Sequence, residues 1–191
     1  MPTSGPSSRT TRELLRTFSS AAVVDDPPQP APVPVDPGRW ERLAHAVLAA
    51  EGAPADVEVG VRFVDEAEMA ALNREHLGAD GPTDVLAFPI DFADGIPRSD
   101  PGVTGEAAAP TMAGDIVICA PVAARNASRR AGAFDDELAL LVVHAVLHLI
   151  GLDHADPVER AAMQQHEREL LASLYGPLAG DPWADAIEEA R

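Results

Sequence analysis

Residues 137–150, ELALLVVHAVLHLI, predict a helix that lies at the centre of the protein. Asp135 or Asp136 can accept a hydrogen bond from a free amide of the first turn and so cap the start of this helix. Leu, Val and Ala side chains fall on nearly every side of the helix, and a helix that is apolar all round is buried. We therefore expect the other elements to pack around this segment.

Helical and strand patterns can be assigned on both sides of the central segment. Apolar stripes that recur every three to four residues indicate helices, and short alternating or continuous apolar runs indicate strands. A segment rich in Gly, Pro, Asp and Ala, residues 91–113, should connect two of the strands. The expected helices cover residues 36–52, 65–78, 156–175 and a stretch that carries Arg125, Arg129 and Arg130, and the expected strands cover residues 57–63, 83–90 and 116–119.

The two ends of the chain differ in composition from the middle. Residues 1–20 are rich in Ser, Thr and Arg and have no apolar run of a secretory signal, which predicts a disordered extension. Residues 177–191 are acidic and are expected to form a flexible tail. Nowhere in the sequence is there the run of about 18 apolar residues that a membrane helix needs.

The charge and cysteine content exclude some classes of function. With 31 acidic and 14 basic residues, the chain of 191 residues has a formal net charge of −17. A protein that binds nucleic acid without specificity, or a polybasic membrane-surface protein, would need a basic face. The single cysteine, Cys119, cannot form an internal disulfide, so we expect a reducing, cytoplasmic compartment and a core role for this residue.

Three of the six histidines lie within residues 144–154, HAVLHLIGLDH. His144 and His148 are four residues apart, so they lie on one face of a helix and can direct two imidazoles at one point. Gly151 can end the helix, and His154 can then supply a third nitrogen. Three neutral imidazoles suit Zn²⁺ and leave one coordination position open, as in catalytic zinc sites. The alternative is that these are core histidines with satisfied N–H groups.

The spacing of the three histidines is close to that of the metzincin proteases, but one position differs. In those enzymes a Glu follows the first His and acts as the general base. Here that position is Ala145. Peptide hydrolysis by that route would lack its proton acceptor, so a hydrolytic metal site is expected without protease chemistry.

Together with two other segments, the histidine motif resembles the YbeY family of bacterial rRNA-maturation endoribonucleases. The family signature H-G-x-L-H-L-x-G-[YF]-D-H corresponds to residues 144–154. The family's L-N followed by P-T-D-V-L-S-F-P corresponds to residues 72–73 and 82–89, and its G-D-I-x-I strand to residues 114–118. The resemblance covers residues 21–176, which we take as the enzymatic domain.

This resemblance implies a fold and an activity. The fold would be α+β, with a small mixed β-sheet, surrounding helices, and a central apolar helix that carries the metal site. One zinc ion per chain would be held by His144, His148 and His154. The activity would be a single-strand-specific, metal-dependent endoribonuclease that matures the 3′ end of 16S rRNA and contributes to ribosome quality control. Partners would be ribosomal RNA and the ribosome, with ribosomal proteins or an assembly GTPase.

At one position the chain departs from the family in a way that bears on catalysis. The family's Arg, a supposed phosphate contact, aligns with Leu77, which cannot donate a hydrogen bond. Arg74 lies one helical turn earlier and is a candidate substitute, or else an ordinary solvated residue. Asp153 could orient a ligand imidazole or cap a loop.

Further candidates for RNA contact are the clustered Arg125, Arg129 and Arg130, which alternatively form local ion pairs with the acidic residues 135–137. Asp84 and Asp115 could line the cleft or cap turns. No ligand role is expected for His45, His76 or His166.

Three functions therefore compete at this point. The first is a zinc-dependent endoribonuclease acting on rRNA, and the second is another zinc hydrolase, including a protease. The third is a non-catalytic ribosome-assembly factor that keeps the zinc for stability, which Leu77 favours. The acidity then indicates that free RNA binds weakly and in a salt-sensitive manner.

Overall fold

The computed structural model describes residues 34–92, 96, 111–130, 132–152 and 156–183. The expected extension at 1–20, the start of the expected domain at 21–33 and most of the connection at 91–113 lie outside these residues. Asp153 and His154 lie outside them too, as do residues 184–191.

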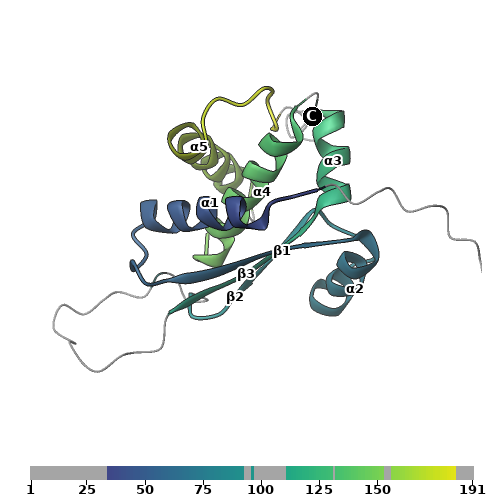
Figure 1. Ribbon diagram of the computed structural model, residues 1–191, viewed down its shortest axis with the longest axis horizontal. Coiled ribbons are helices and arrows are strands. Elements are labelled where there is room, and N and C mark those ends of the chain that lie inside the picture. Colours follow the sequence, from purple (N-terminus) through teal and green to yellow (C-terminus); the bar gives the residue numbers. More distant parts are fainter. Residues whose placement is uncertain (1–33, 93–95, 97–110, 131, 153–155, 184–191) are drawn as a thin grey trace, which may run out of the picture. The chain divides into compact units, whose positions relative to one another are not determined.

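Five helices and three strands occur in the described residues, and they confirm the elements expected from the patterns (Figure 1). In chain order they are α1 (Pro37–Ala50), β1 (Glu58–Val64), α2 (Glu66–Leu77), β2 (Val85–Pro89), β3 (Met112–Cys119), α3 (Ala120–Arg129), α4 (Phe134–Leu149) and α5 (Pro157–Leu174).

Local capping explains where several helices begin and end. The Asp36 carboxylate accepts a hydrogen bond from the Gly38 amide at the start of α1, and Asp65 accepts one from Glu68 at the start of α2. Asp156 and Glu159 form a reciprocal capping box on α5. Gly78 ends α2 with a φ of 67°, a left-handed conformation that favours glycine.

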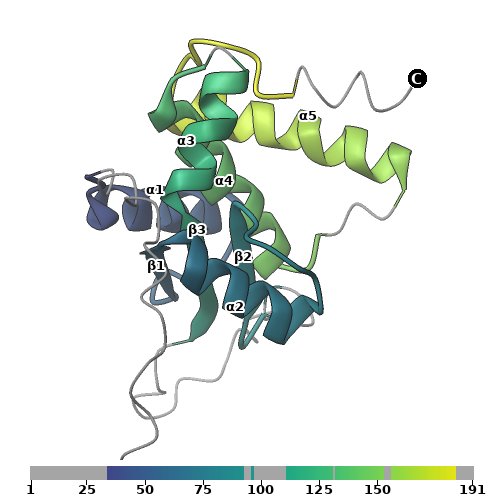
Figure 2. The same cartoon turned by 90° about the vertical axis from the view of Figure 1, so that its right-hand side faces the viewer.

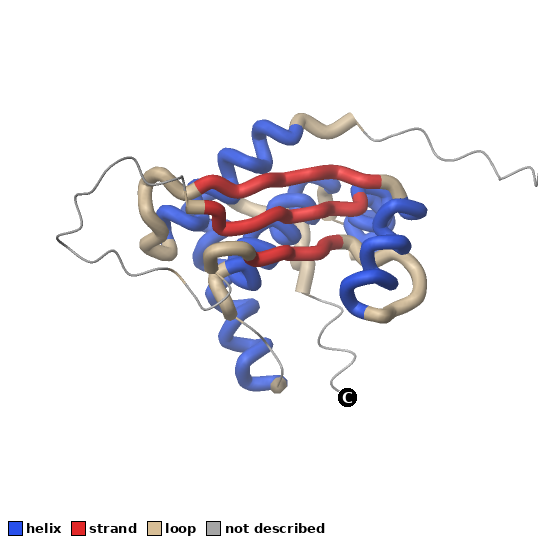
Figure 3. Tube along the Cα trace, turned by 90° about the horizontal axis from the view of Figure 1, so that it is seen from below, coloured by secondary structure: helices blue, strands red, loops and turns tan. Residues whose placement is uncertain are grey.

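The three strands form one mixed sheet in the order β1-β3-β2, and they lie side by side in Figure 3. β1 runs parallel to β3, and β2 runs antiparallel to β3. Gly114 of β3, at φ 147°, lies where the strand meets both β2 and α4, and a Cβ there would lie 2.2 Å from the Phe88 carbonyl oxygen and 2.9 Å from a Leu149 methyl carbon. The expected α+β class with a small mixed sheet is confirmed.

The core is built around α4, which packs against α1, α3, α5 and the strands β2 and β3. Ile116 and Ile118 of β3 face the main core cluster with α1 and α4, whereas Val117 and Cys119 face a second cluster with Met69 of α2. Helices therefore cover both faces of the sheet, and α5 lies on the side of α4 away from it (Figures 1 and 2). Twelve of the sixteen residues of α4 are buried, which confirms its central place.

The structure corrects the expected start of α4. Its N-cap is Ala133, which makes no side-chain cap, so neither Asp135 nor Asp136 caps the helix. Both carboxylates lie in the first turn, where the helix dipole still favours negative charge. Asp136 is buried and accepts hydrogen bonds from the Tyr175 hydroxyl at 3.0 Å and the Ala179 amide at 2.7 Å. Its side chain is therefore used for tertiary contacts.

The end of α5 and the segment after it also differ from expectation. The apolar pattern of this helix predicts Met163, Leu170, Leu171 and Leu174 on its inward face, but Leu174 is 37% exposed, and Glu167 is buried there at 2%. The flexible tail was expected to begin at residue 177, yet Trp183 packs against the core with 7% of its surface exposed. The acidic composition of this stretch hid Trp183 and Leu178, which pack against the core. None of the helices in the described ranges is long and apolar enough to cross a membrane.

Candidate metal site and adjoining pocket

His144 and His148 converge at the exposed side of α4. Their Nε2 atoms lie 3.1 Å apart, and their ring centroids are 4.6 Å apart at an interplanar angle of 80°. Two nitrogens bound to one tetrahedral zinc, at about 2.0–2.1 Å each, would lie about 3.3 Å apart. The pair thus has the spacing of two ligands to a single metal ion.

The third expected ligand cannot be placed, because His154 lies outside the described residues. Among the described residues, no three side chains of His, Cys, Asp or Glu come together as a metal site. The two-histidine pair on α4 is therefore what the structure provides, and the three-ligand site and the role of Asp153 stay predictions.

A buried carboxylate holds the first of the two histidines. Glu167 of α5, 2% exposed, accepts a hydrogen bond from His144 Nδ1 at 2.7 Å. Because a carboxylate only accepts, the Nδ1 of His144 must carry the proton, and its Nε2 then presents a lone pair toward His148. This is the arrangement by which proteins orient a metal-binding imidazole.

The sequence reasoning missed Glu167. The only signal was its spacing: it lies four residues after Met163 and three before Leu170, two apolar residues of the stripe that α5 buries. A lone acid within an apolar stripe is a candidate for a buried, hydrogen-bonded role. Its second oxygen accepts a hydrogen bond from the Trp183 indole at 2.7 Å.

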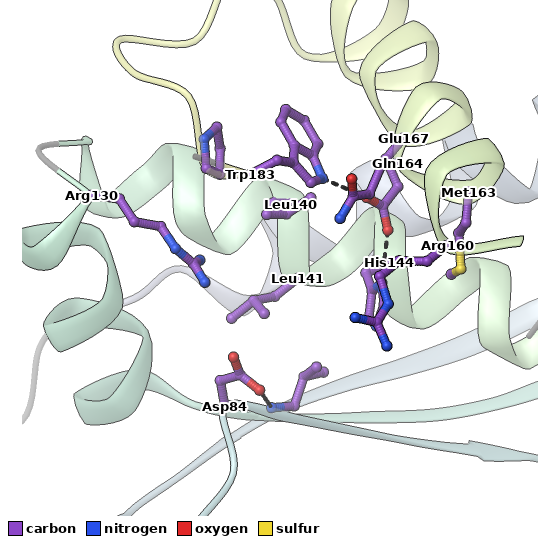
Figure 4. A pocket seen from close by; sticks show the side chains of 12 residues that line it. Asp84, Arg130, Leu140, Leu141, His144, Arg160, Met163, Gln164, Glu167 and Trp183 are labelled. Atoms are coloured by element: carbon purple, nitrogen blue, oxygen red, sulfur yellow. Dashed lines mark hydrogen bonds and ion pairs between the residues drawn. The ribbon is translucent and has the colours of Figure 1, made fainter. Parts of the chain in front are cut away.

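A pocket of about 270 Å³ opens beside His144 and Glu167 (Figure 4). Its wall combines apolar side chains from α4 and α5 with two guanidinium groups, from Arg130 and Arg160. Arg160 was not among the expected site residues. The lining residues are Asp84, Val85, Arg130, Leu140, Leu141, His144, Arg160, Met163, Gln164, Glu167, Pro182 and Trp183.

Arg130 is held in place by Glu137, which is 2% exposed. One guanidinium nitrogen donates to both carboxylate oxygens, at 2.8 and 3.1 Å. Burial raises the pKa of the Glu137 carboxyl, and Arg130 opposes that rise. The pocket therefore contains a cation whose position is set by a buried acid.

Asp84 combines the two roles considered for it. Its carboxylate accepts hydrogen bonds from the Val85 amide at 2.9 Å and from the Asn126 side chain at 3.1 Å, and it also lines the pocket. Asp115 instead lies at a separate groove on the other face of the sheet, with Arg62 and Phe88.

The other expected arginines lie elsewhere. Arg74 is 67% exposed in its side chain, lies 3.9 Å from Asp80, and is not among the described residues that line the pocket. Arg125 pairs with Glu66, and Arg129 is exposed. The three arginines therefore do not form one cluster. Arg125 and Arg130 each form an ion pair, but only Arg130 pairs within residues 135–137, whereas Arg125 pairs with Glu66 of α2.

The other described histidines and the cysteine lie away from the α4 pair. His45 is exposed, His76 packs edge-on against Phe88, and His166 pairs with Glu51 at 2.7 Å. Cys119 is fully buried, and burial raises the pKa of its thiol. Its expected core role is confirmed.

Comparisons with known proteins agree with the motifs. The family model described as Endoribonuclease YbeY matches residues 32–175. The protein named Endoribonuclease YbeY from Thermobifida fusca is 40% identical over 157 residues, covering 82% of this chain and 92% of that protein. Relatives of the same name are 49% identical over 117 residues in Salinispora tropica (61% and 73% covered) and 42% over 128 residues in Halorhodospira halophila (67% and 75%).

Proposed function

The chain belongs to the endoribonuclease YbeY family, and from that premise we propose that it is a zinc-dependent endoribonuclease that cleaves single-stranded RNA. Family membership supports the nuclease activity. The zinc dependence is supported by the chain's own residues, which would hold one ion through His144, His148 and His154. The observation that carries the metal proposal is the 3.1 Å approach of the two Nε2 atoms, with His144 fixed by Glu167.

The residues around the pair fit this chemistry. A bound zinc ion would supply a Lewis acid beside the scissile phosphate. Glu167 keeps the proton on His144 Nδ1, so that Nε2 can act as a metal ligand. Arg130 and Arg160, which line the same pocket, would bind phosphoryl oxygens and balance their negative charge.

These two arginines are better placed than Arg74 to replace the family Arg that is Leu77 here. Leu77 is 67% exposed and has no polar group. We infer that this chain contacts phosphate from α3 and α5, through Arg130 and Arg160, and not from α2.

The substrate would be ribosomal RNA, with maturation of the 16S 3′ end and ribosome quality control in the cytoplasm as the setting. The net charge of −17 supports a need for delivery, since most of the surface repels phosphate. The ribosome, ribosomal proteins or an assembly GTPase would bring RNA to the pocket. A protease function is less favoured, because Ala145 is 1% exposed and offers no proton acceptor.

The test combines metal analysis with cleavage of ribosomal RNA and of casein. Wild-type protein should contain about one zinc per chain and cut RNA but not casein. His148→Ala should lose both zinc and cleavage, whereas His45→Ala, which removes an exposed histidine on α1, should keep both. Full zinc without cleavage would favour the non-catalytic assembly factor. Metal-free wild type that still cleaves would refute the zinc dependence.

A further inference from the structure

The segment that follows α5 returns to the site and is fixed at two points. We call residues 175–183 the C-terminal strap. At its start, Asp136 of α4 accepts hydrogen bonds from the Tyr175 hydroxyl and the Ala179 amide. At its end, the Trp183 indole donates to Glu167 at 2.7 Å, and Pro182 and Trp183 form part of the pocket wall (Figure 4).

The end of the strap is built to hold the indole in one orientation. The guanidinium carbon of Arg168 lies 4.2 Å from the centre of the Trp183 ring, a cation–π distance. Asp181 accepts a hydrogen bond from the Trp183 amide at 3.0 Å and lies 3.7 Å from Arg168. The direction of the indole N–H is thus set by contacts on both its ring and its backbone.

Glu167 depends on this N–H because its carboxylate is withdrawn from water. Its Oε1 accepts from His144 and its Oε2 from Trp183, so each oxygen has one donor. A buried carboxylate that loses a donor is strongly destabilised, and it can rotate or move toward another partner. Either response would loosen the hydrogen bond that sets the proton position on His144.

We propose that Trp183 is a positioning residue for the metal site, which acts through Glu167 to keep the proton of His144 on Nδ1, so that Nε2 can bind a metal ion. This inference rests on the proposed function only where it concerns zinc. The orientation of His144 is a property of the protein without metal.

The first experiment measures zinc affinity by competition with a chelator. Trp183→Phe keeps an aromatic ring and removes the N–H, and should weaken zinc binding about three- to tenfold, while Glu167→Gln should weaken it about 10–100-fold. Trp40→Phe is the matched control, since Trp40 is also buried, at 1% exposed against 7% for Trp183, and lies on α1. It should leave the affinity unchanged.

The second experiment reads the proton on His144 directly, without metal. Nitrogen-15 NMR at pH 8 should show His144 as the Nδ1–H tautomer in the wild type and in Trp40→Phe. In Trp183→Phe the two tautomers should be mixed. If Trp183→Phe unfolds, the benzothiophene analogue of tryptophan at 183 keeps the bicyclic ring, lacks the N–H and gives the same comparison.

The outcomes separate the two hypotheses. Unchanged zinc affinity and an unchanged His144 tautomer in the Trp183 variants would overturn the positioning role and leave Trp183 as a packing residue. Failure of the wild type to bind zinc would refute the zinc dependence, and the tautomer comparison would then decide on Trp183 alone.

Discussion

Replacing Arg130 with methionine should destabilise the protein, because it leaves the buried Glu137 carboxylate without its cation. Arg130→Met keeps most of the aliphatic volume and removes both hydrogen bonds, at 2.8 and 3.1 Å, to a carboxylate that is 2% exposed. Breaking a buried ion pair from one side costs about 3–5 kcal/mol. Since the Arg130 side chain is 24% exposed, we expect the low end, about 3 kcal/mol, or a fall in Tm of about 6–12 °C.

The loss of stability in Arg130→Met should be larger at neutral pH than at acidic pH. Burial already raises the pKa of Glu137 in the folded protein, and Arg130 opposes that rise, so the variant should have a still higher pKa. A group whose pKa is raised on folding stabilises the folded protein most at pH values below its pKa in the unfolded chain, which is about 4.3 for Glu. That stabilisation is lost as pH rises through the pKa that the group has in the folded protein. The deficit of Arg130→Met relative to wild type should therefore be largest at pH 7 and smaller at pH 5.

The assay is urea unfolding of both proteins at the two pH values. Arg125→Met is the control, because it removes an exposed pair with Glu66 and should cost less than about 1 kcal/mol at either pH. The double variant Arg130→Met with Glu137→Gln should return to within about 1 kcal/mol of wild type, because no buried charge is left unpaired. If Arg130→Met matched Arg125→Met at both pH values, or if the double variant were no better than the single one, the reasoning would be wrong.

Three further outcomes follow from buried groups. The single tyrosine, Tyr175, has a pKa raised to about 12 by burial and by its hydrogen bond to Asp136. Ultraviolet absorbance of the folded protein should therefore show only about a tenth of the phenolate at pH 11, and the free energy of unfolding should fall as pH rises from about 10 through 12; half-formed phenolate at pH 10 in folded protein would contradict this. Cys119 should resist a thiol reagent in the native protein and react fully in urea, and rapid native labelling would show that β3 is not buried as described. Gly114→Ala should cost about 3 kcal/mol or more, measured by urea unfolding, because the added Cβ meets the Phe88 carbonyl at 2.2 Å at a positive φ; a neutral effect would refute the close approach of Gly114 on β3 to Phe88 on β2.

The sequence was most informative where structure depends on neighbours along the chain. The helices expected at 36–52, 65–78 and 156–175 begin at Asp36, Asp65 and Asp156, and in the structure these three residues cap α1, α2 and α5, as local sequence patterns can indicate. The i, i+4 spacing of His144 and His148 likewise predicted that the two rings meet. The predicted start of α4 was wrong because the Asp136 carboxylate accepts hydrogen bonds from Tyr175 and Ala179, which lie far along the chain, and not from the helix amides.

What the sequence could not supply were pairings between distant residues. Glu167 is 23 residues from His144, and Trp183 is 16 residues from Glu167, so no local pattern joins them. Arg130 could be expected near acidic residues, but only the packing of α3 on α4 selects the buried Glu137 as its partner. The same holds for the pocket cations, because Arg160 joins Arg130 only when α5 lies along α4.

The C-terminal strap also links metal binding to the rate at which a protease can cut residues 175–183. Linkage is reciprocal, so under the proposal a metal ion that binds more tightly when Trp183 is docked on Glu167 would, by the same free energy, favour the docked state. Proteases cut segments that open, and a docked strap opens less often when the site is loaded. Metal supply would then set how long residues 175–183 survive digestion, and the rate of trimming at this end would report on occupancy of the site without any measurement of RNA cleavage.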